Sequence, residues 1–477
     1  MLHVFGQHRA ATRFPIVPTL AVTFAIGLIS SYPVRAQSLA TQILESPAYP
    51  VRYSDDTLTN GLRVLIVESH FAPVISADLF VRAGMRDQVP RPGIAHLLEH
   101  LTGDTLPDYA RRAGVAFNAS TGSQTTVYFF TAPSANFEPA LYYLAAILRP
   151  PLLDSARLSR EKRVVIAEGG QRASNRAYGL SESCLGQLYW NAQLNCTGPD
   201  DWDRATLAMG AQDLTDFFHS RYRPNDATLV VVGDVATADA LAQISRYFGD
   251  IQRGPARRRF ESQTASPAAK RFVLTDTLAP ASRLDIAYAT VAGGSPEYAA
   301  LSVLATILGR GESSLLKRRL VDERQLVTHI EVSGVDLDGS SDPVPLIITA
   351  VVKRGVDPET AERAIGEEIV RLAINPVPRA DLERAKSVLA REFLAVTRGG
   401  GSGGLAYSLG FYATVNRNPE LINSWLHAVD AVTQNDLSTI IARLFNSPPR
   451  VVVTTLPAAL ESAGVRRRRK ERSERRS

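Results

Sequence analysis

Two histidines and a glutamate interrupt an apolar stretch with the sequence Pro92-Gly93-Ile94-Ala95-His96-Leu97-Leu98-Glu99-His100-Leu101. His96 and His100 are four residues apart, so both imidazoles project from one face if this stretch is an α-helix. Two neutral imidazoles at that spacing can bind one zinc ion. Glu99 lies beside them and can accept a proton from a zinc-bound water, whose pKa the metal lowers. The motif therefore predicts a zinc site with Glu99 as general base.

The pattern His-x-x-Glu-His is the inverse of the common zinc-peptidase signature, but three constrained positions also arise by chance. The alternative is a helix that exposes these polar side chains to solvent. Ile94, Leu97 and Leu98 leave little room for a solvated face. Burying ionisable groups there without a metal or another partner is unfavourable. A third ligand is needed to decide between the two interpretations.

Candidates for that ligand lie on a second predicted helix, Glu161-Lys162-Arg163-Val164-Val165-Ile166-Ala167-Glu168. Glu161 and Glu168 are seven residues apart and so share one side of the helix. A carboxylate would complete the two-histidine, one-glutamate set of a catalytic zinc site. Glu168 is the candidate ligand, and Glu161 is a candidate for orienting a histidine. The alternative is that both glutamates are at the surface and pair with Lys162, Arg163 or Arg172, and helical spacing alone favours that alternative.

Strands and helices alternate on both sides of these motifs. In the first half, strands are predicted at 62–67, 77–81, 115–120, 125–130 and 229–233, and helices at the zinc motif, 137–148, 158–172 and 214–222. In the second half, strands are predicted at 283–288, 346–352 and 451–455, and helices at 298–308, 358–374 and 379–395. The second half repeats the first without the histidines, which indicates an internal duplication. This order predicts an α+β fold of two similar domains, each with a mixed or antiparallel sheet packed with helices.

The chain of 477 residues is too long for one hydrophobic core. Residues 254–269 are polar and basic, and they are the predicted linker between a zinc-binding domain at 50–253 and a second domain at 270–460. Residues 1–36 combine a basic start, an apolar run and the small-x-small sequence Val34-Arg35-Ala36. That combination predicts a cleaved secretory signal and a periplasmic protein without stable membrane insertion, with an uncleaved anchor as the alternative.

The net charge of +5 is carried by the two ends of the chain. Residues 466–477 hold eight Lys/Arg and two Glu, and residues 1–36 hold three Arg and no acid, which leaves −4 for the remainder. The basic tail at 461–477 is predicted to be disordered and does not indicate a nucleic-acid-binding surface.

The two cysteines, Cys184 and Cys196, lie close together in sequence. In an oxidising compartment this spacing favours a disulfide over zinc ligation by the pair.

These motifs together resemble the pitrilysin/insulinase family of zinc peptidases, in the short-chain branch that includes mitochondrial processing peptidase. The resemblance runs from about Asp56 to Leu456 and rests on Gly93 to His100, Asn118-Ala119-Ser120-Thr121, Glu161 with Glu168, and Tyr222-Arg223-Pro224-Asn225 before the strand at 229–233. It implies zinc bound by His96, His100 and Glu168, with Glu99 as general base and Asn118 near the substrate backbone. It also implies two similar α+β halves that close around a peptide.

The sequence departs from the family pattern in two places. The segment between His100 and Asn118 is shorter than usual, which trims the structure beside the site. In active members, the stretch that matches Ser313 to Thr328 supplies an Arg and a Tyr that hold the substrate and the developing oxyanion. Here Val321 and Thr328 stand at those positions. We therefore expect the chain to be the metal-bearing subunit of a heterodimer whose homologous partner supplies the Arg/Tyr pair, or otherwise a homodimer.

The sequence thus predicts a periplasmic zinc endopeptidase that cleaves peptides or unfolded segments with metal-activated water. The alternative is a non-catalytic assembly or peptide-binding subunit that keeps the zinc motif. A zinc-bearing structural protein whose basic tail docks it to membranes is a third interpretation.

Overall fold

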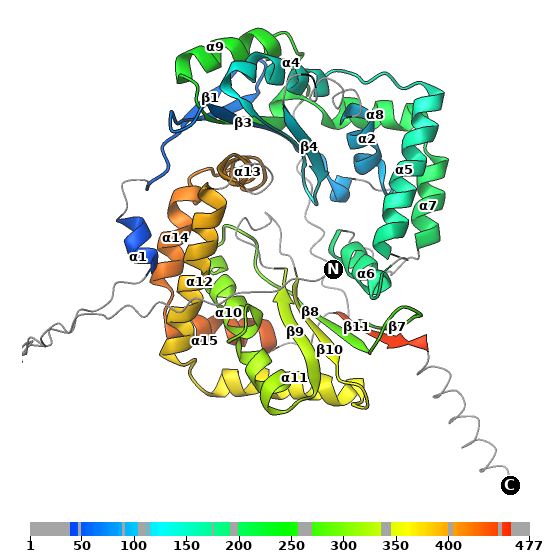
Figure 1. Cartoon of the computed structure of the whole chain (residues 1–477), viewed down its shortest axis with the longest axis vertical. Helices are drawn as coiled ribbons and strands as arrows, with labels where there is room; N and C mark the ends of the chain where they lie inside the picture. Colours follow the sequence, from blue (N-terminus) through cyan, green and yellow to red (C-terminus); the bar gives the residue numbers. More distant parts are fainter. Residues whose placement is uncertain are drawn as a thin grey trace, which may run out of the picture. The chain divides into compact units, whose positions relative to one another are not determined.

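Figure 1 shows the computed structural model of the chain. It describes residues 39–45, 49–87, 91–103, 112, 115–173, 176–190, 199–255, 270–334, 345–398, 404–446 and 451–458. The predicted signal segment and basic tail lie outside these residues, as do residues 256–269 of the predicted linker. Among the described helices, none is both long and apolar enough to cross a lipid bilayer.

The first half of the chain forms a six-stranded sheet with the strand order β1-β2-β6-β3-β5-β4. Its strands are β1 (Ser54–Thr57), β2 (Arg63–Glu68), β3 (Val74–Val81), β4 (Ala116–Thr121), β5 (Thr126–Pro133) and β6 (Ala227–Gly233). β2 and β6 are parallel, and the other neighbouring strands are antiparallel. Among the described strands, β4 pairs with β5 alone, so it forms one edge of this sheet.

The second half forms a five-stranded sheet with the order β7-β11-β8-β10-β9. Its strands are β7 (Lys270–Asp276), β8 (Arg283–Tyr288), β9 (Val327–Ser333), β10 (Leu346–Val352) and β11 (Val451–Pro457). β7 and β11 are parallel, and the remaining pairs are antiparallel. With β1 left out, the strands of both sheets have the same order within their half, and the same positions form the parallel pair. This shared topology is what an internal duplication produces. The predicted domain boundaries remain a prediction.

Helices pack around both sheets (Figure 1). Those of the first half are α1 (Leu39–Leu44), α2 (Ile94–Gly103), α4 (Phe137–Ile147), α5 (Ser155–Ala173), α6 (Gly179–Trp190), α7 (Pro199–Ala208), α8 (Ala211–Arg221) and α9 (Thr237–Phe248). Those of the second half are α10 (Tyr298–Gly309), α11 (Pro358–Ile374), α12 (Arg379–Arg398), α13 (Leu405–Phe411), α14 (Leu421–Ala431) and α15 (Gln434–Phe445). The predicted α+β fold is confirmed.

The inner strands of the first sheet are buried on both faces, and alternate residues along each strand face different partners. Leu79 on β3 belongs to the core beneath the helices of the first half. Its neighbour Phe80 points the other way, into a core shared with the second half. There the helix α13 packs on β3 and β6, and the Phe80 ring lies 5.7 Å from that of Tyr407. The short helix α13 therefore covers the inner face of the first sheet.

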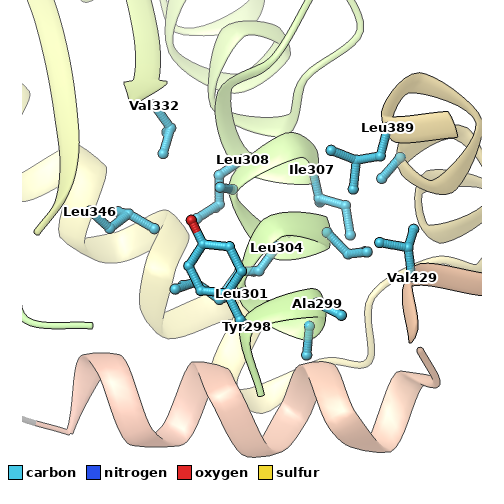
Figure 2. Close-up of a cluster of buried hydrophobic side chains, with 14 of the residues drawn as sticks. Tyr298, Ala299, Leu301, Leu304, Ile307, Leu308, Val332, Leu346, Leu389 and Val429 are labelled. Carbon is cyan, nitrogen blue, oxygen red and sulfur yellow. The ribbon is translucent and has the colours of Figure 1, made fainter. Parts of the chain in front are cut away.

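The helix α10 of the second half follows β8 as α2 follows β3, and it lacks the histidines of α2. Every residue of α10 is buried. Figure 2 shows Leu301, Leu304 and Leu308 of α10 among Val332 of β9 and Leu346 of β10. The counterpart of the metal-motif helix is thus an apolar core helix.

Candidate metal centre

The helix α2 presents His96 and His100 on one side and an apolar face on the other. Gly93, just before the helix, has φ +91°, a left-handed conformation that a residue with a Cβ adopts only with strain. Ile94, Leu97 and Leu98 are buried in the first core, which fixes the rotation of the helix. The two imidazoles are left half-buried, with their ring centroids 4.8 Å apart.

Helix α5 brings Glu168 to the two histidines. The Nε2 atoms of His96 and His100 are 3.3 Å apart. Glu168 places Oε2 3.5 Å from Nε2 of His96 and Oε1 3.7 Å from Nε2 of His100. The three side chains can each offer one ligand atom, with all of these atoms within 4.8 Å of one another. The structure therefore brings together the three ligands predicted from the sequence.

The three side chains lie close enough together to bind one zinc ion. Ligand atoms about 2.0–2.1 Å from a common centre lie about 3.3 Å apart at the corners of a tetrahedron. The two histidine Nε2 atoms are 3.3 Å apart, which matches that value. Each of them approaches a different oxygen of Glu168, at 3.5 and 3.7 Å, and with one ligand atom taken from each side chain all three lie within 4.8 Å of one another. Two imidazole nitrogens and one carboxylate are also the donor set of catalytic zinc sites that keep a fourth position for water.

Glu161 lies behind His100 and is buried, at 5% exposure, so the alternative of a surface glutamate is wrong for this residue. Its Oε2 is 3.3 Å from Nδ1 of His100, and its Oε1 accepts a 2.8 Å hydrogen bond from Arg160. If the proton of the neutral His100 ring is on Nδ1, this N–H donates a hydrogen bond to Glu161. Nε2 is then unprotonated and faces Glu168. This is the geometry expected of a residue that orients a metal ligand.

Glu99 lies on the turn of α2 between the histidines and is buried, at 9% exposure. Its Oε2 accepts a 2.5 Å hydrogen bond from the hydroxyl of Thr121, the last residue of β4. The sequence pattern does not predict this contact. In the structure, exposed and half-buried residues alternate along β4, so Thr121 lies on the side opposite the exposed Asn118 and Ser120.

Buried hydroxyl groups hold the end of α2 from behind. Thr102 donates to the carbonyls of its own helix and lies 2.6 Å from the hydroxyl of Tyr128. Tyr128 in turn lies 2.8 Å from the hydroxyl of Tyr222. Burial raises the pKa of Tyr128 and of Tyr222, with a smaller contribution from the charge of Glu99. Both phenols therefore stay neutral and act as hydrogen-bonding groups. Arg157 of α5 also donates to the carbonyl of Leu101, which ties α5 to the last turn of α2.

The remaining predicted site residues lie on strands or in the second half. Asn118 is exposed on the edge strand β4 and accepts a 2.9 Å hydrogen bond from the backbone N–H of Ala119. Val321 lies in a π-helical turn, Lys317–Glu323, and Thr328 is exposed on β9. Cys184 is buried and disulfide-bonded, in line with the predicted pairing, and Cys196 lies outside the described residues.

Two family models match the chain. Residues 63–194 match "Insulinase (Peptidase family M16)", and residues 208–389 match "Peptidase M16 inactive domain". The first segment contains the three potential metal ligands, Glu99 and Glu161, and the second contains α10.

Named relatives include zinc protease PqqE of Helicobacter pylori, which is 24% identical over 376 residues, or 74% of this chain and 82% of that protein. The beta subunit of mitochondrial-processing peptidase from Lentinula edodes is 24% identical over 408 residues, or 80% of this chain and 85% of that protein. A solved structure of a protease from Helicobacter pylori aligns with a TM-score of 0.75 and 20% identity, over 85% of this chain and 99% of that chain. The first half of the periplasmic protease PqqL from Escherichia coli aligns with a TM-score of 0.66 and 17% identity, over 86% of this chain and 93% of that chain. The structural matches agree with the α+β fold.

Proposed function

This chain belongs to the insulinase family of peptidases, family M16, and on that premise we propose that it is a zinc-dependent endopeptidase. The proposal rests on the cluster of three potential ligand atoms, which lie within 4.8 Å of one another, with Glu99 on the same turn of α2.

His96, His100 and Glu168 would hold the zinc ion. When bound, zinc lowers the pKa of a water ligand and polarises a substrate carbonyl. Glu99 accepts the proton that the water loses as its oxygen bonds to the peptide carbon. Glu99 then returns this proton to the amide nitrogen as the carbon–nitrogen bond breaks. The hydroxyl groups behind α2 and the contact from Arg157 keep the helix that carries Glu99 in place.

The edge strand β4 is the proposed binding site for an extended peptide. Among the described strands it pairs on one side alone, with β5, so its other side can pair with a peptide backbone. Asn118 is exposed on this strand and can hydrogen-bond to that backbone. Thr121, three residues further along, contacts Glu99, so a peptide bound on β4 lies beside the proposed general base.

The second half of the chain offers little positive charge to a substrate oxyanion in the segment predicted to supply it. All four arginines of residues 310–324 are in ion pairs. They are Arg310 with Glu392, Arg318 with Asp381, Arg319 with Glu323, and Arg324 with Glu367. Val321 and Thr328 carry no charge. This supports a heterodimer in which a homologous subunit supplies the missing Arg and Tyr.

Residues 1–36 and the likeness to a periplasmic protease support a periplasmic location. A protein without residues 1–36 is the form to assay.

The test is hydrolysis of an unfolded polypeptide by the zinc-loaded chain, alone and together with a homologous subunit that carries the Arg/Tyr pair. We expect cleavage with the partner and little without it. Full activity of the chain alone would contradict an active site shared with a second subunit. It would still support the proposal of a zinc endopeptidase. One zinc per chain without cleavage in either assay would instead favour the non-catalytic, peptide-binding alternative.

A further inference from the structure

The general base of the proposed reaction has a hydrogen-bond donor on the neighbouring strand β4. The hydroxyl of Thr121 donates to Oε2 of Glu99 over 2.5 Å. Glu99 is buried, and a hydrogen bond to a buried carboxylate is among the stronger ones in proteins. A glutamate carboxylate otherwise rotates freely about its last side-chain torsion, which is broad and roughly two-fold. The bond from Thr121 fixes that torsion.

The position of Thr121 is itself fixed by the hairpin that joins β4 to β5. Thr121 pairs with Thr126 in the strand register, and their hydroxyl groups are 3.4 Å apart. Thr126 is fully buried and donates a 2.8 Å hydrogen bond to the carbonyl of Ala83. The turn is closed by a 2.8 Å bond from the N–H of Gly122 to the carbonyl of Thr125. The donor is therefore held more rigidly than a loop side chain would be.

The turn is also attached to the segment after β3. The N–H of Met85 donates to the carbonyl of Gly122 over 2.9 Å, and the N–H of Arg86 donates to the carbonyl of Ser123 over 3.0 Å. A Cβ on Gly84 would lie 2.6 Å from the backbone of Ser123, so these two segments are in close contact. The hairpin cannot shift along α2 without breaking this attachment.

We propose that Thr121 is a positioning residue that orients the Glu99 carboxylate for proton transfer. This inference rests on the proposed peptidase function. The strand that is proposed to bind the peptide then also sets the orientation of the base, because Asn118 and Thr121 belong to the same six residues of β4. Substrate alignment and base alignment are in this way set by one rigid element.

The test compares Thr121→Val, which keeps the shape and removes the hydroxyl, with Thr121→Ser, which keeps the hydroxyl. Thr57→Val is the matched control, because Thr57 is an exposed threonine on β1, at the opposite edge of the same sheet. In Thr121→Val we expect kcat to fall by about 10–100-fold, with KM within about twofold and one zinc retained per chain. Thr121→Ser and Thr57→Val are expected to stay within about threefold of the wild type. An unchanged kcat in Thr121→Val would overturn the proposal. An equal fall in kcat in Thr121→Val and Thr121→Ser would also overturn it, because Thr121→Ser keeps the hydroxyl group.

A double-mutant cycle separates this role from a structural one. If Thr121 acts through Glu99, adding Thr121→Val to Glu99→Gln causes no further loss of residual activity. A further loss equal to that of the single Thr121→Val variant would mean that the threonine acts elsewhere and would overturn the proposal.

A crystal structure of the zinc-loaded protein gives a second measurement that needs no activity. The wild type is expected to show Glu99 in one orientation with the Thr121 contact, and Thr121→Val to show a rotated or disordered carboxylate. Absence of the contact in the wild type, or an unchanged carboxylate in the variant, overturns the proposal even if the chain hydrolyses nothing. Failure of the proposed function is recognised separately, by hydrolysis that Glu99→Gln leaves intact.

Discussion

A carboxyl group buried in the middle of the first sheet is expected to make the stability of the protein depend on pH. Asp78 lies on the central strand β3 and is fully buried. Its Oδ1 accepts a 3.3 Å hydrogen bond from Ser76, and its Oδ2 has no hydrogen-bond partner among the residues that the structure describes. Burial raises the pKa of Asp78 from 3.8 to about 8, and the bond from Ser76 offsets only part of that rise. The perturbation is Asp78→Asn, which removes the titration and keeps the shape.

The direction of the pH dependence is set by the number of protons that Asp78 binds in the folded and unfolded states. In the unfolded chain the carboxyl loses its proton near its ordinary pKa of 3.8, whereas the folded protein holds the proton up to about pH 8. The free energy of unfolding therefore falls by about 1.4 kcal/mol per pH unit as pH rises between these two pKa values. Between the ordinary pKa and pH 7 this amounts to about 4 kcal/mol as an upper estimate. The free energy of unfolding is least affected below about pH 4 and falls as pH rises towards 8.

The assay is urea denaturation of the wild type and Asp78→Asn at pH 5, 6, 7 and 8. The difference between the two proteins isolates Asp78, because every other titrating group is common to both. We expect this difference to shift in favour of the variant by about 1.4 kcal/mol per pH unit up to pH 7, and by less as pH 8 is approached. The test is the change of this difference with pH, because the buried amide of the variant adds an offset to the free energy of unfolding that does not depend on pH. Asp239→Asn, at an exposed carboxylate, is the control and is expected to show a flat difference. A flat difference for Asp78→Asn would mean that the pKa of Asp78 is not raised in the folded protein.

Three further perturbations test other parts of the structure. Arg283→Met removes the guanidinium 2.9 Å from the fully buried Asp285 and is expected to lower the free energy of unfolding by about 3–5 kcal/mol, and a loss below about 1 kcal/mol would contradict this. Gly410→Ala would place a Cβ 2.0 Å from the ring of Phe80 and is expected to destabilise by about 1–3 kcal/mol. Its control is Gly366→Ala, on a helix where no atom lies within 4 Å of the new Cβ, and this change is expected to stabilise by about 1 kcal/mol. Equal effects of the two changes in urea denaturation would contradict the close packing of α13 on Phe80. Removal of zinc by a chelator is expected to lower the thermal midpoint and zinc addition to restore it, whereas a midpoint that ignores the chelator would argue against a metal at this site.

The elements that could be predicted from the sequence are those whose periodicity is local. Strand β10 has the predicted bounds, as have β8 and α11. Strand β10 is a nearly continuous apolar run, β8 is a short stretch of mostly apolar residues, and α11 has apolar residues at helical spacing after a proline at its first position. The helix α13 has seven residues and follows a glycine-rich stretch, so it carries no comparable pattern. It is stabilised by contacts with β3 and β6, whose residues lie far away in the sequence. Tertiary packing determines such an element.

The candidate site divides in the same way. His96, Glu99 and His100 could be identified because a helix places residues four apart on one face. Glu168 could not be chosen on helical spacing alone, since its position depends on how α5 packs against α2. Thr121 could not be connected to Glu99 at all, because a hairpin 22 residues further along the chain brings the two together.

The most direct test of the central claim is a comparison of the wild type with Glu99→Gln under matched zinc loading. Both proteins are assayed with the partner subunit for cleavage of an unfolded polypeptide, and bound zinc is measured in the same samples. We expect equal zinc in both proteins, close to one per chain, and a loss of activity of about 100-fold or more in the variant. Undiminished cleavage by Glu99→Gln at full zinc occupancy would contradict the assignment of Glu99 as general base and, with it, the proposed mechanism.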